Sequence, residues 1–305
     1  DLHLCDRRQR QMCIRDRAFI GLGVMGFPMA GHLQKAGFAV AVYNRTVMKA
    51  REWAGEYGGQ WAPTPRQASE GAEVVFMCVG NDDDVRSVVY GEDGVLAGMT
   101  EGTVLVDHTT TSARLSEELF TASKQKGIDF IDAPVSGGQS GAENGKLTIF
   151  CGGEEAVFER IVPVLQAYGV SMQCFGPAGS GQRAKMVNQI CIAGIVEALS
   201  EGIAFGVNAG LPMERVMPAL NLGAAGSWQM ENRSRTMLAG EFTFGFAVDW
   251  MRKDLGFALD EAKRNGSELP LVALVDKFYG EVQEAGGGRW DTSSLITRLP
   301  QNVKK

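Results

Sequence analysis

Residues 18–30 read AFIGLGVMGFPMA, which is a short apolar run, a glycine turn and the opening of a helix. Gly21 permits a tight turn, Gly23 lets the backbone approach a pyrophosphate, and Gly26 allows the helix to pack close to the strand. Unpaired amides at the helix start favour an anion there. Because an isolated G-x-G-x-x-G also occurs as an ordinary glycine turn, the surrounding sequence has to decide. The residues that we expect to bind a dinucleotide here are Gly21, Leu22, Gly23, Val24, Met25 and Gly26.

Strand and helix patterns alternate after this turn. Four apolar strand-like runs between 38 and 132 are separated by helical patterns, and two further runs between 147 and 175 flank another helix. Such alternation predicts an α/β fold with a Rossmann-type doubly wound parallel sheet and helices on both faces. One long helical pattern follows at 180–208, and the rest of the chain reads as helices and loops. We therefore expect a dinucleotide-binding domain at 18–178 and an all-helical domain at 179–305, joined by the long helix.

The first 17 residues, DLHLCDRRQRQMCIRDR, differ in character from the rest of the chain. They are rich in arginine and aspartate, lack apolar periodicity and lack the apolar core of a signal peptide. We expect residues 1–17 to be a non-native or disordered extension. The first strand of a doubly wound sheet is usually central and apolar, so the charged residues 15–17 predict a strand that is short or frayed at its start.

Composition and charge narrow the class of protein. The 305 residues carry a net charge of −6, which argues against a nucleic-acid-binding surface. Uninterrupted apolar runs fall well short of the roughly 20 residues that a membrane span needs, so we expect no membrane segment. The six cysteines form no C-x-x-C pair, so we expect neither a metal site nor a disulfide framework. A cytoplasmic protein is the default expectation.

The residues Asn44, Arg45 and Thr46 end the second predicted strand, where a dinucleotide fold usually presents an acidic residue to the ribose 2′-hydroxyl. An acidic group would repel a 2′-phosphate, whereas an amide, a guanidinium and a hydroxyl would bind one. We therefore predict NADP(H) as the preferred cofactor, with NAD(H) as the alternative. The competing interpretation is a solvent-exposed arginine beside a threonine N-cap, although a cation in the first helical turn opposes the helix dipole.

Two later strand ends should lie on the same edge of the sheet. Val79, Gly80 and Asn81 follow one strand, and residues 107–110 follow the next, so both loops should approach the nicotinamide half of the cofactor. The aspartates at 82–84 could suggest a metal site, but they immediately precede a helix, where carboxylates cap and complement the dipole. For the histidine at position 108 we expect a structural role.

A glycine-rich loop is the candidate site for the substrate. The segment DAPVSGG at 132–138 follows a strand and brings the Ser136 hydroxyl and the amides of Gly137 and Gly138 to the carboxyl edge of the sheet. Such a group of donors suits a substrate carboxylate. Taken alone, the segment could equally be a flexible loop.

Lys185 lies near the start of the long helix, with Asn188 and Gln189 on the same face at i+3 and i+4. A partly desolvated lysine near a positive helix end and a cationic nicotinamide should have a lowered pKa, which suits an acid/base group. A surface lysine is the alternative interpretation.

Four separated segments together resemble the β-hydroxyacid dehydrogenase family, which includes 3-hydroxyisobutyrate dehydrogenase, tartronate semialdehyde reductase and glyoxylate/succinic semialdehyde reductases. The segments are GLGVMG at 21–26, DAPVSGG at 132–138, GPAGSG at 176–181 leading to Lys185, and KDL at 253–255. The resemblance covers residues 18 to 299. It implies a Rossmann domain, an all-helical domain, and a homodimer or homotetramer built largely through the helical domains.

The resemblance also implies roles for individual residues. Lys185 would be the catalytic acid/base, and Asn188 or Gln189 would assist it. Several members carry an asparagine four residues after the lysine, whereas this chain has Gln189 there and Asn188 one residue earlier, so which amide contacts the substrate stays open. The implied substrate-binding residues are Ser136, Gly137 and Gly138, and the implied cofactor contacts are Thr110 and Lys253.

We therefore predict an NADP(H)-dependent oxidoreductase that transfers hydride between the nicotinamide and a small 3-hydroxy acid or carboxylate-bearing semialdehyde. The substrate would be of the 3-hydroxyisobutyrate or 2-hydroxy-3-oxopropionate type. One alternative is a non-catalytic dinucleotide-binding scaffold, which the presence of Lys185 disfavours. Another is an enzyme similar to the imine reductases, which commonly carry a different proton donor at the lysine position. The related 6-phosphogluconate dehydrogenases have a longer helical domain and a His-Asn pair after the lysine, and this chain has neither.

Overall fold

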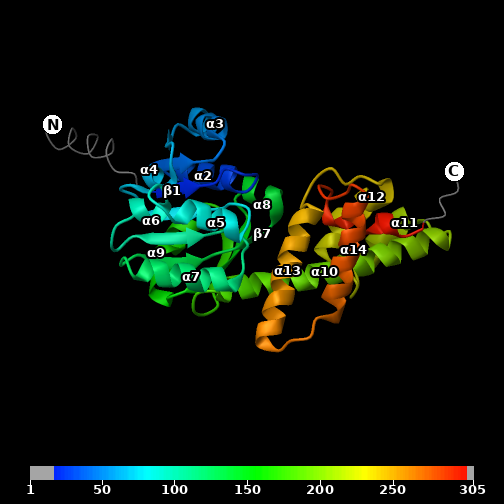
Figure 1. Cartoon of the computed structure of the whole chain (residues 1–305). Coiled ribbons are helices and arrows are strands. Elements are labelled where there is room, and N and C mark those ends of the chain that lie inside the picture. Colours follow the sequence, from blue (N-terminus) through cyan, green and yellow to red (C-terminus); the bar gives the residue numbers. More distant parts are fainter. Residues whose placement is uncertain (1–16, 301–305) are drawn as a thin grey trace. The chain divides into compact units, whose positions relative to one another are not determined.

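The computed structural model describes residues 17–300, and the chain divides into two compact units between Lys185 and Met186 (Figure 1). The first unit is a sheet covered by helices, and the second is helical. The division lies seven residues beyond the expected boundary at 178, because the long helix begins in the first unit and continues into the second.

The first unit is built on a nine-stranded sheet in which the neighbours run β3-β2-β1-β4-β5-β6-β8-β7, with β9 beside β8. The six strands from β3 to β6 are parallel, so the predicted Rossmann-type sheet is confirmed. Beyond them the direction changes: β8 is antiparallel to both β6 and β7, and β9 is parallel to β8. The strands are β1 (Arg17–Ile20), β2 (Val40–Tyr43), β3 (Gln60–Trp61), β4 (Val74–Met77), β5 (Val104–Asp107), β6 (Asp129–Asp132), β7 (Val135–Ser136), β8 (Leu147–Gly153) and β9 (Gly169–Cys174).

Successive strand residues point to opposite sides of the sheet, and both sides carry apolar residues. Helices therefore cover both faces. On one face Phe19 and Phe76 pack with residues of α2, α3 and α9. On the other face Ile20 and Met77 pack with residues of α4, α5, α6 and α7. The helices of this unit are α2 (Gly26–Lys35), α3 (Val47–Tyr57), α4 (Pro65–Ser69), α5 (Asp82–Val89), α6 (Val95–Gly98), α7 (Ala113–Lys124), α8 (Gly138–Glu143) and α9 (Glu155–Leu165).

The first strand corrects the expectation about the N-terminal extension. Arg17, assigned to that extension, belongs to β1, and its backbone N–H donates to the Ala39 carbonyl at 3.1 Å. Its guanidinium pairs with Glu73 at 2.9 Å and lies over the Phe38 ring. A charged residue is accommodated here because it is paired and stacked, so the strand is not frayed at this residue. Residues 1–16 of the expected extension lie outside the described residues.

The helical unit contains a core formed mainly by α10, α13 and α14, in which Met251, Leu255 and Tyr279 are fully buried. Helices α13 and α14 pack side by side (Figure 1). A second cluster joins α10 to α11 and α12. The elements are α10 (Ser180–Asn208), α11 (Met213–Asn221), α12 (Trp228–Ala239), α13 (Val248–Asn265), α14 (Pro270–Glu284) and the 3-10 helix η1 (Thr292–Arg298).

Helix α10 is long and apolar enough to cross a membrane if only length and composition are considered. Its most apolar 18-residue window has a mean hydropathy of 1.8, and 44% of that window is buried within the chain. Polar residues interrupt the apolar stretches of this helix, so it contains no long uninterrupted apolar run. The core helix of a folded unit passes the same test, so this property is weak evidence for a membrane span.

Candidate active site

The glycine turn between β1 and α2 has the backbone geometry that its sequence requires. Gly21 has φ 96°, and a Cβ on it would lie 2.3 Å from the Cys78 carbonyl oxygen. A Cβ on Gly26 would lie 2.0 Å from the Gly21 oxygen. By contrast, no atom within residues 17–300 comes within 4 Å of a Cβ built on Gly23. Two glycines therefore serve close packing, and the third leaves open space beside the backbone.

The start of α2 fits a phosphate group. Within the described residues its first turn contains no acidic side chain, and Met25, the residue before the helix, makes no side-chain cap. The positive end of the helix dipole is therefore not offset by an acidic side chain and favours an anion. Val24 is 64% exposed at this turn. The residues present fit the pyrophosphate of a dinucleotide.

The Asn44 side chain supports the glycine turn itself. Its Oδ1 accepts from the Leu22 N–H at 2.9 Å, and its Nδ2 donates to the Thr46 carbonyl at 3.1 Å. Thr46 is the N-cap residue of α3 but makes no side-chain cap bond in the described structure. The Arg45 side chain is 86% exposed and lies 3.4 Å from Asp84. Arg45 precedes the N-cap, so it lies outside the first helical turn in which the sequence argument had placed a cation.

The aspartates at 82–84 form the first turn of α5 and contact protein groups. Asn81 caps α5 by accepting from the Asp84 N–H at 2.9 Å. Asp82 accepts from both the backbone N–H and the hydroxyl of Ser112, and so links the start of α5 to that of α7. The backbone N–H of Val79 donates to the Thr109 hydroxyl at 3.0 Å, which ties the β4 loop to the β5 loop.

His108 is part of the core. It is 2% exposed, its Nδ1 lies 2.7 Å from the Ala133 carbonyl oxygen, and its Nε2 lies 2.8 Å from the Tyr168 hydroxyl. Burial lowers the pKa of His108 to about 4, so the ring is neutral at pH 7. Since a carbonyl can only accept, Nδ1 carries the proton and Nε2 accepts from Tyr168. This arrangement agrees with the structural role that we expected.

Two buried aspartates end neighbouring strands in register. Asp107 closes β5 and accepts from the Thr109 N–H at 2.8 Å, and Asp132 closes β6. Burial raises the pKa of Asp107 to about 7 and also raises that of Asp132 to about 7, although hydrogen bonds oppose the shift in both. The Asp132 carboxylate accepts from the Gly179 N–H at 2.7 Å and from the Gln182 N–H at 2.9 Å. It therefore caps the first turn of α10.

The predicted substrate loop has a defined conformation. Ser136 pairs with Thr148 in the short β7–β8 ladder. Gly137 and Gly138 have φ values of 128° and 63°, and both are left-handed conformations that disfavour other residues. Gly138 is the first residue of helix α8, so a helix follows Gly137 and not the flexible loop that the sequence also allows.

Buried polar side chains follow one face of α10 at spacings of three and four residues. Gln182, Lys185 and Gln189 are 0%, 7% and 2% exposed. In the helical unit the Gln189 side chain accepts from Asn188 Nδ2 at 2.8 Å and donates to Asp254 at 2.7 Å. Lys253 Nζ lies 3.5 Å from the Asp254 carboxylate and packs over the rings of Trp250 and Phe257.

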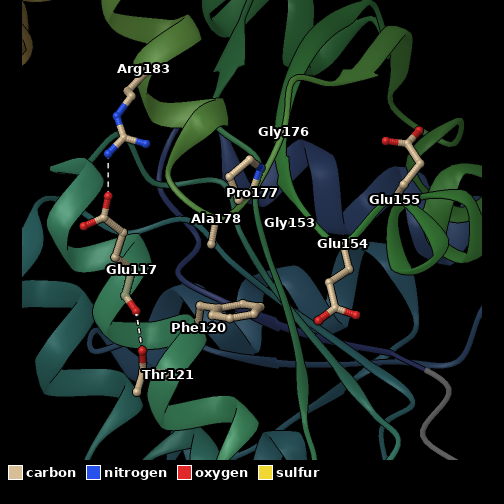
Figure 2. A pocket seen from close by; sticks show the side chains of 10 residues that line it. All are labelled: Glu117, Phe120, Thr121, Gly153, Glu154, Glu155, Gly176, Pro177, Ala178 and Arg183. Carbon is tan, nitrogen blue, oxygen red and sulfur yellow. Dashed lines mark hydrogen bonds and ion pairs between the residues drawn. The ribbon is translucent and has the colours of Figure 1, made fainter.

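Figure 2 shows a pocket of about 630 Å³ beside the start of α10. Phe120 of α7, Glu154 and Pro177 line it, and Arg183 of α10 forms an ion pair with Glu117 of α7 at its rim. The ten lining residues include none of the predicted cofactor or substrate residues. The ion pair links α10 to α7. This pocket is therefore not the predicted cofactor or substrate site.

Family models match both halves of the chain. One, described as "NAD binding domain of 6-phosphogluconate dehydrogenase", matches residues 16–176. The other, described as "NAD-binding of NADP-dependent 3-hydroxyisobutyrate dehydrogenase", matches residues 179–299. The chain belongs to the β-hydroxyacid dehydrogenase family.

Individual relatives agree with this assignment. An uncharacterized oxidoreductase of Shewanella frigidimarina is 58% identical over 93% of this chain and 98% of the relative. The 2-hydroxy-3-oxopropionate reductase of Escherichia coli is 35% identical over 92% of this chain and 96% of that protein. The solved structure of Mycobacterium tuberculosis 3-hydroxyisobutyrate dehydrogenase with L-serine has a TM-score of 0.85 and 28% identity, and the match covers 94% of this chain and 99% of that one. This β-hydroxyacid dehydrogenase is thus an NAD(P)-dependent oxidoreductase that acts on CH–OH groups.

Within this β-hydroxyacid dehydrogenase, the two amides that follow Lys185 differ in their surroundings. Both ends of the buried Gln189 amide are bonded to protein, whereas the half-buried Asn188 uses only its Nδ2 in the described contacts. Gln189 is therefore a connector between Asn188 and Asp254. Asn188 is the amide with an oxygen left for a ligand.

Sequence reasoning missed the two residues that hold the start of α10. The motif places Asp132 in the substrate loop but does not indicate a helix cap, and Gln182 was not singled out. The signal for Gln182 was present in the spacing, since Gln182, Lys185 and Gln189 form a polar i, i+3, i+7 row on one face of the helix.

Proposed function

We propose that this β-hydroxyacid dehydrogenase uses NADP(H) to interconvert a small 3-hydroxy acid and the corresponding carboxylate-bearing semialdehyde. The substrate is of the 3-hydroxyisobutyrate or 2-hydroxy-3-oxopropionate type. The names of the Escherichia coli and Mycobacterium tuberculosis relatives and of the matching helical-domain family support this class. The observation that carries the proposal is a buried lysine, Lys185, on the turn of α10 that follows the contacts to both the β5 and β6 loops.

Lys185 is the acid/base group. When bound, the nicotinamide supplies or accepts the hydride at the carbonyl carbon. Lys185 donates a proton to the carbonyl oxygen in reduction and removes it from the hydroxyl in oxidation. Ser136, Gly137 and Gly138 hold the substrate carboxylate, and Asn188 orients the reacting oxygen, since its own oxygen is not used by Gln189.

The cofactor is held at the carboxyl edge of the first unit. Gly23 and the start of α2 receive the pyrophosphate, because Gly23 leaves open space beside the backbone and the first turn of α2 contains no acidic side chain. Arg45 and Thr46 hold the 2′-phosphate. The ion pair of Arg45 with Asp84 is solvent-exposed and is worth at most about 1 kcal/mol, so a phosphate can replace the carboxylate.

The catalytic assignment is tested with Lys185→Met, which keeps the length of the side chain and removes its amine. NADPH oxidation is followed with 2-hydroxy-3-oxopropionate, methylmalonate semialdehyde, succinic semialdehyde and glyoxylate, and NADP⁺ reduction with 3-hydroxyisobutyrate. We expect the variant to lose at least about 10³-fold in kcat, within the range of general acid/base effects, while its Kd for NADPH changes less than about threefold. Retained turnover would exclude Lys185 as the acid/base.

The cofactor preference is tested with Arg45→Ala. Loss of a charge-assisted contact to the 2′-phosphate should weaken NADPH binding about tenfold and leave NADH binding unchanged. Arg51→Ala is the matched control, because Arg51 lies on α3, the helix that follows Arg45, and stacks over Trp61. A wild-type enzyme that prefers NADH, or an equal effect of both variants, would contradict the assignment.

We also propose a homodimer or homotetramer formed through the helical unit. An apolar stripe on α10 supports this, because Val187, Ile195 and Phe205 lie within one arc of the helix and are 61%, 40% and 73% exposed. Light scattering should give a multiple of the 32.8 kDa chain mass, and Phe205→Glu should lower it. A monomeric wild-type protein at micromolar concentration would exclude this arrangement.

A further inference from the structure

We propose that Gln182 and Asp132 are positioning residues that fix Lys185 relative to the loops carrying Thr110 and Ser136. The inference rests on the proposed function, in which Lys185 is the acid/base. Neither residue is assigned a contact with substrate or cofactor. Their role is to determine where the first turns of α10 begin.

The Gln182 side chain forms two hydrogen bonds with the backbone of the loop after β5, which carries Thr110. Its Nε2 donates to the Thr109 carbonyl at 2.8 Å, and its Oε1 accepts from the Thr111 N–H at 3.0 Å. The two contacts bracket Thr110, and the side chain is fully buried. Because Lys185 is at i+3 from Gln182, it lies on the same face of α10. The two hydrogen bonds therefore fix the position of Lys185 relative to this loop.

Asp132 supplies the corresponding link to the substrate loop. It ends β6 four residues before Ser136, and its carboxylate binds the amides of Gly179 and Gln182. The start of α10 is closely packed against β8, since a Cβ on Gly181 would lie 2.4 Å from the Phe150 carbonyl oxygen. The lysine-bearing turn therefore cannot shift without breaking these contacts.

A glutamine at position 182 indicates that this side chain does more than pack the helix against the sheet. An apolar side chain would fill the same buried volume, whereas the glutamine amide matches one backbone N–H and one backbone carbonyl two residues apart. Such a pair satisfies two buried backbone groups and also defines a geometry. A displacement of about 1 Å at a catalytic group can reduce turnover about 10²-fold.

The test uses Gln182→Met in the full-length protein, because methionine conserves length and volume but cannot form either hydrogen bond. We expect kcat for reduction of 2-hydroxy-3-oxopropionate to fall by about 10- to 100-fold, with KM values for substrate and NADPH within about threefold of wild type. Single-turnover NADPH oxidation should fall equally, because the chemical step is the one affected. Hydrogen exchange of the peptide covering residues 107–113 should accelerate.

Arg183→Met is the matched control. Arg183 is the next residue on α10, and its guanidinium pairs with Glu117 on α7. We expect its kcat to stay within about twofold of wild type. Equal loss in both variants, or a wild-type kcat in Gln182→Met with accelerated exchange, would assign Gln182 to folding alone and overturn the proposal.

Gln182→Glu adds a readout that depends on the hydrogen bonds themselves. A protonated carboxyl can donate to Thr109 and accept from Thr111, whereas a carboxylate would face the Thr109 carbonyl. The ratio of its kcat to that of wild type should therefore rise as the pH falls from 8 to 6. Asp107 and Asp132 are present in both proteins, so the ratio to wild type removes the pH dependence that they give to both. A low ratio that does not change with pH would contradict the proposal.

Failure of the proposed function gives a different pattern. If Lys185→Met stays active, or if wild type reduces none of the semialdehydes, the catalytic assignment fails. The exchange data on residues 107–113 would still report whether Gln182 orders the loop. If Lys185→Met is inactive and Gln182→Met is fully active, only the positioning role fails.

Discussion

Replacing Asp107 with asparagine should change how the stability of this protein depends on pH. Asp107 is fully buried, and its Oδ1 accepts from the Thr109 N–H at 2.8 Å. Its Oδ2 has no hydrogen-bond partner within the described chain. Asparagine has the same shape, keeps the acceptor for Thr109 and cannot ionise. The Asp107→Asn variant therefore reproduces the protonated form of the wild type at every pH.

The magnitude depends on the pKa of Asp107, which burial raises from 3.8 to about 7. Because the native state holds the proton more tightly than the unfolded state, the stabilisation is complete below about pH 4 and is lost as the pH rises through about 7. Integrated from pH 5 to pH 8, a shift of this size corresponds to a loss of about 3 kcal/mol. The substituted asparagine does not ionise, so the variant escapes this loss.

The assay is urea unfolding followed by circular dichroism at pH 5, 6, 7 and 8, without nucleotide. The free energy of unfolding of Asp107→Asn minus that of wild type should increase by about 3 kcal/mol across this range. Asp83→Asn is the exposed control, since the Asp83 side chain is 96% exposed, and its difference from wild type should stay constant. A constant or decreasing difference for Asp107→Asn would refute the reasoning.

Two further substitutions test the glycine turn and the histidine in the core. Gly26→Ala should destabilise the fold by about 3 kcal/mol, because its Cβ would meet the Gly21 carbonyl, whereas Gly23→Ala should fold normally and weaken NADPH binding at least about tenfold. Thermal unfolding and fluorescence titration separate these effects, and equal stability of the two variants would contradict the roles given to the glycines. Tyr168→Phe leaves the buried Nε2 of His108 without its donor and should lower the free energy of unfolding by about 1–3 kcal/mol. A change below about 0.5 kcal/mol in urea unfolding, a limit set by the error of the method, would show that this hydrogen bond is not needed.

Local sequence signals were sufficient where one element determines its own shape. The long helix was predicted at 180–208, and the structure has it at Ser180–Asn208. The glycines at 21 and 26 were assigned to a tight turn and a close approach, and both have the expected geometry. The short elements β3, α4, α6 and α8 were missed, because two to six residues carry too little periodicity to be recognised.

Contacts between distant segments could not be predicted in the same way. The sequence placed Asp132 in a loop motif, but its carboxylate accepts from the amide of Gly179, 47 residues later, at the start of a helix. Gln182 binds a carbonyl 73 residues away, and His108 binds a hydroxyl 60 residues away. No local pattern encodes such partners, because they depend on which strands become neighbours.

The sequence by itself determined the Rossmann class, the dinucleotide turn and the lysine on the long helix, since glycine conformations and apolar periodicity are properties of short segments. Only the tertiary structure decided that Arg17 belongs to the first strand, that β8 runs antiparallel to β6, and that two buried aspartates end adjacent strands. It also decided what surrounds the start of α10, where Asp132 and Gln182 meet. The physical reason is that hydrogen bonding and the low dielectric of the interior act between groups brought together by folding, whatever their separation along the chain.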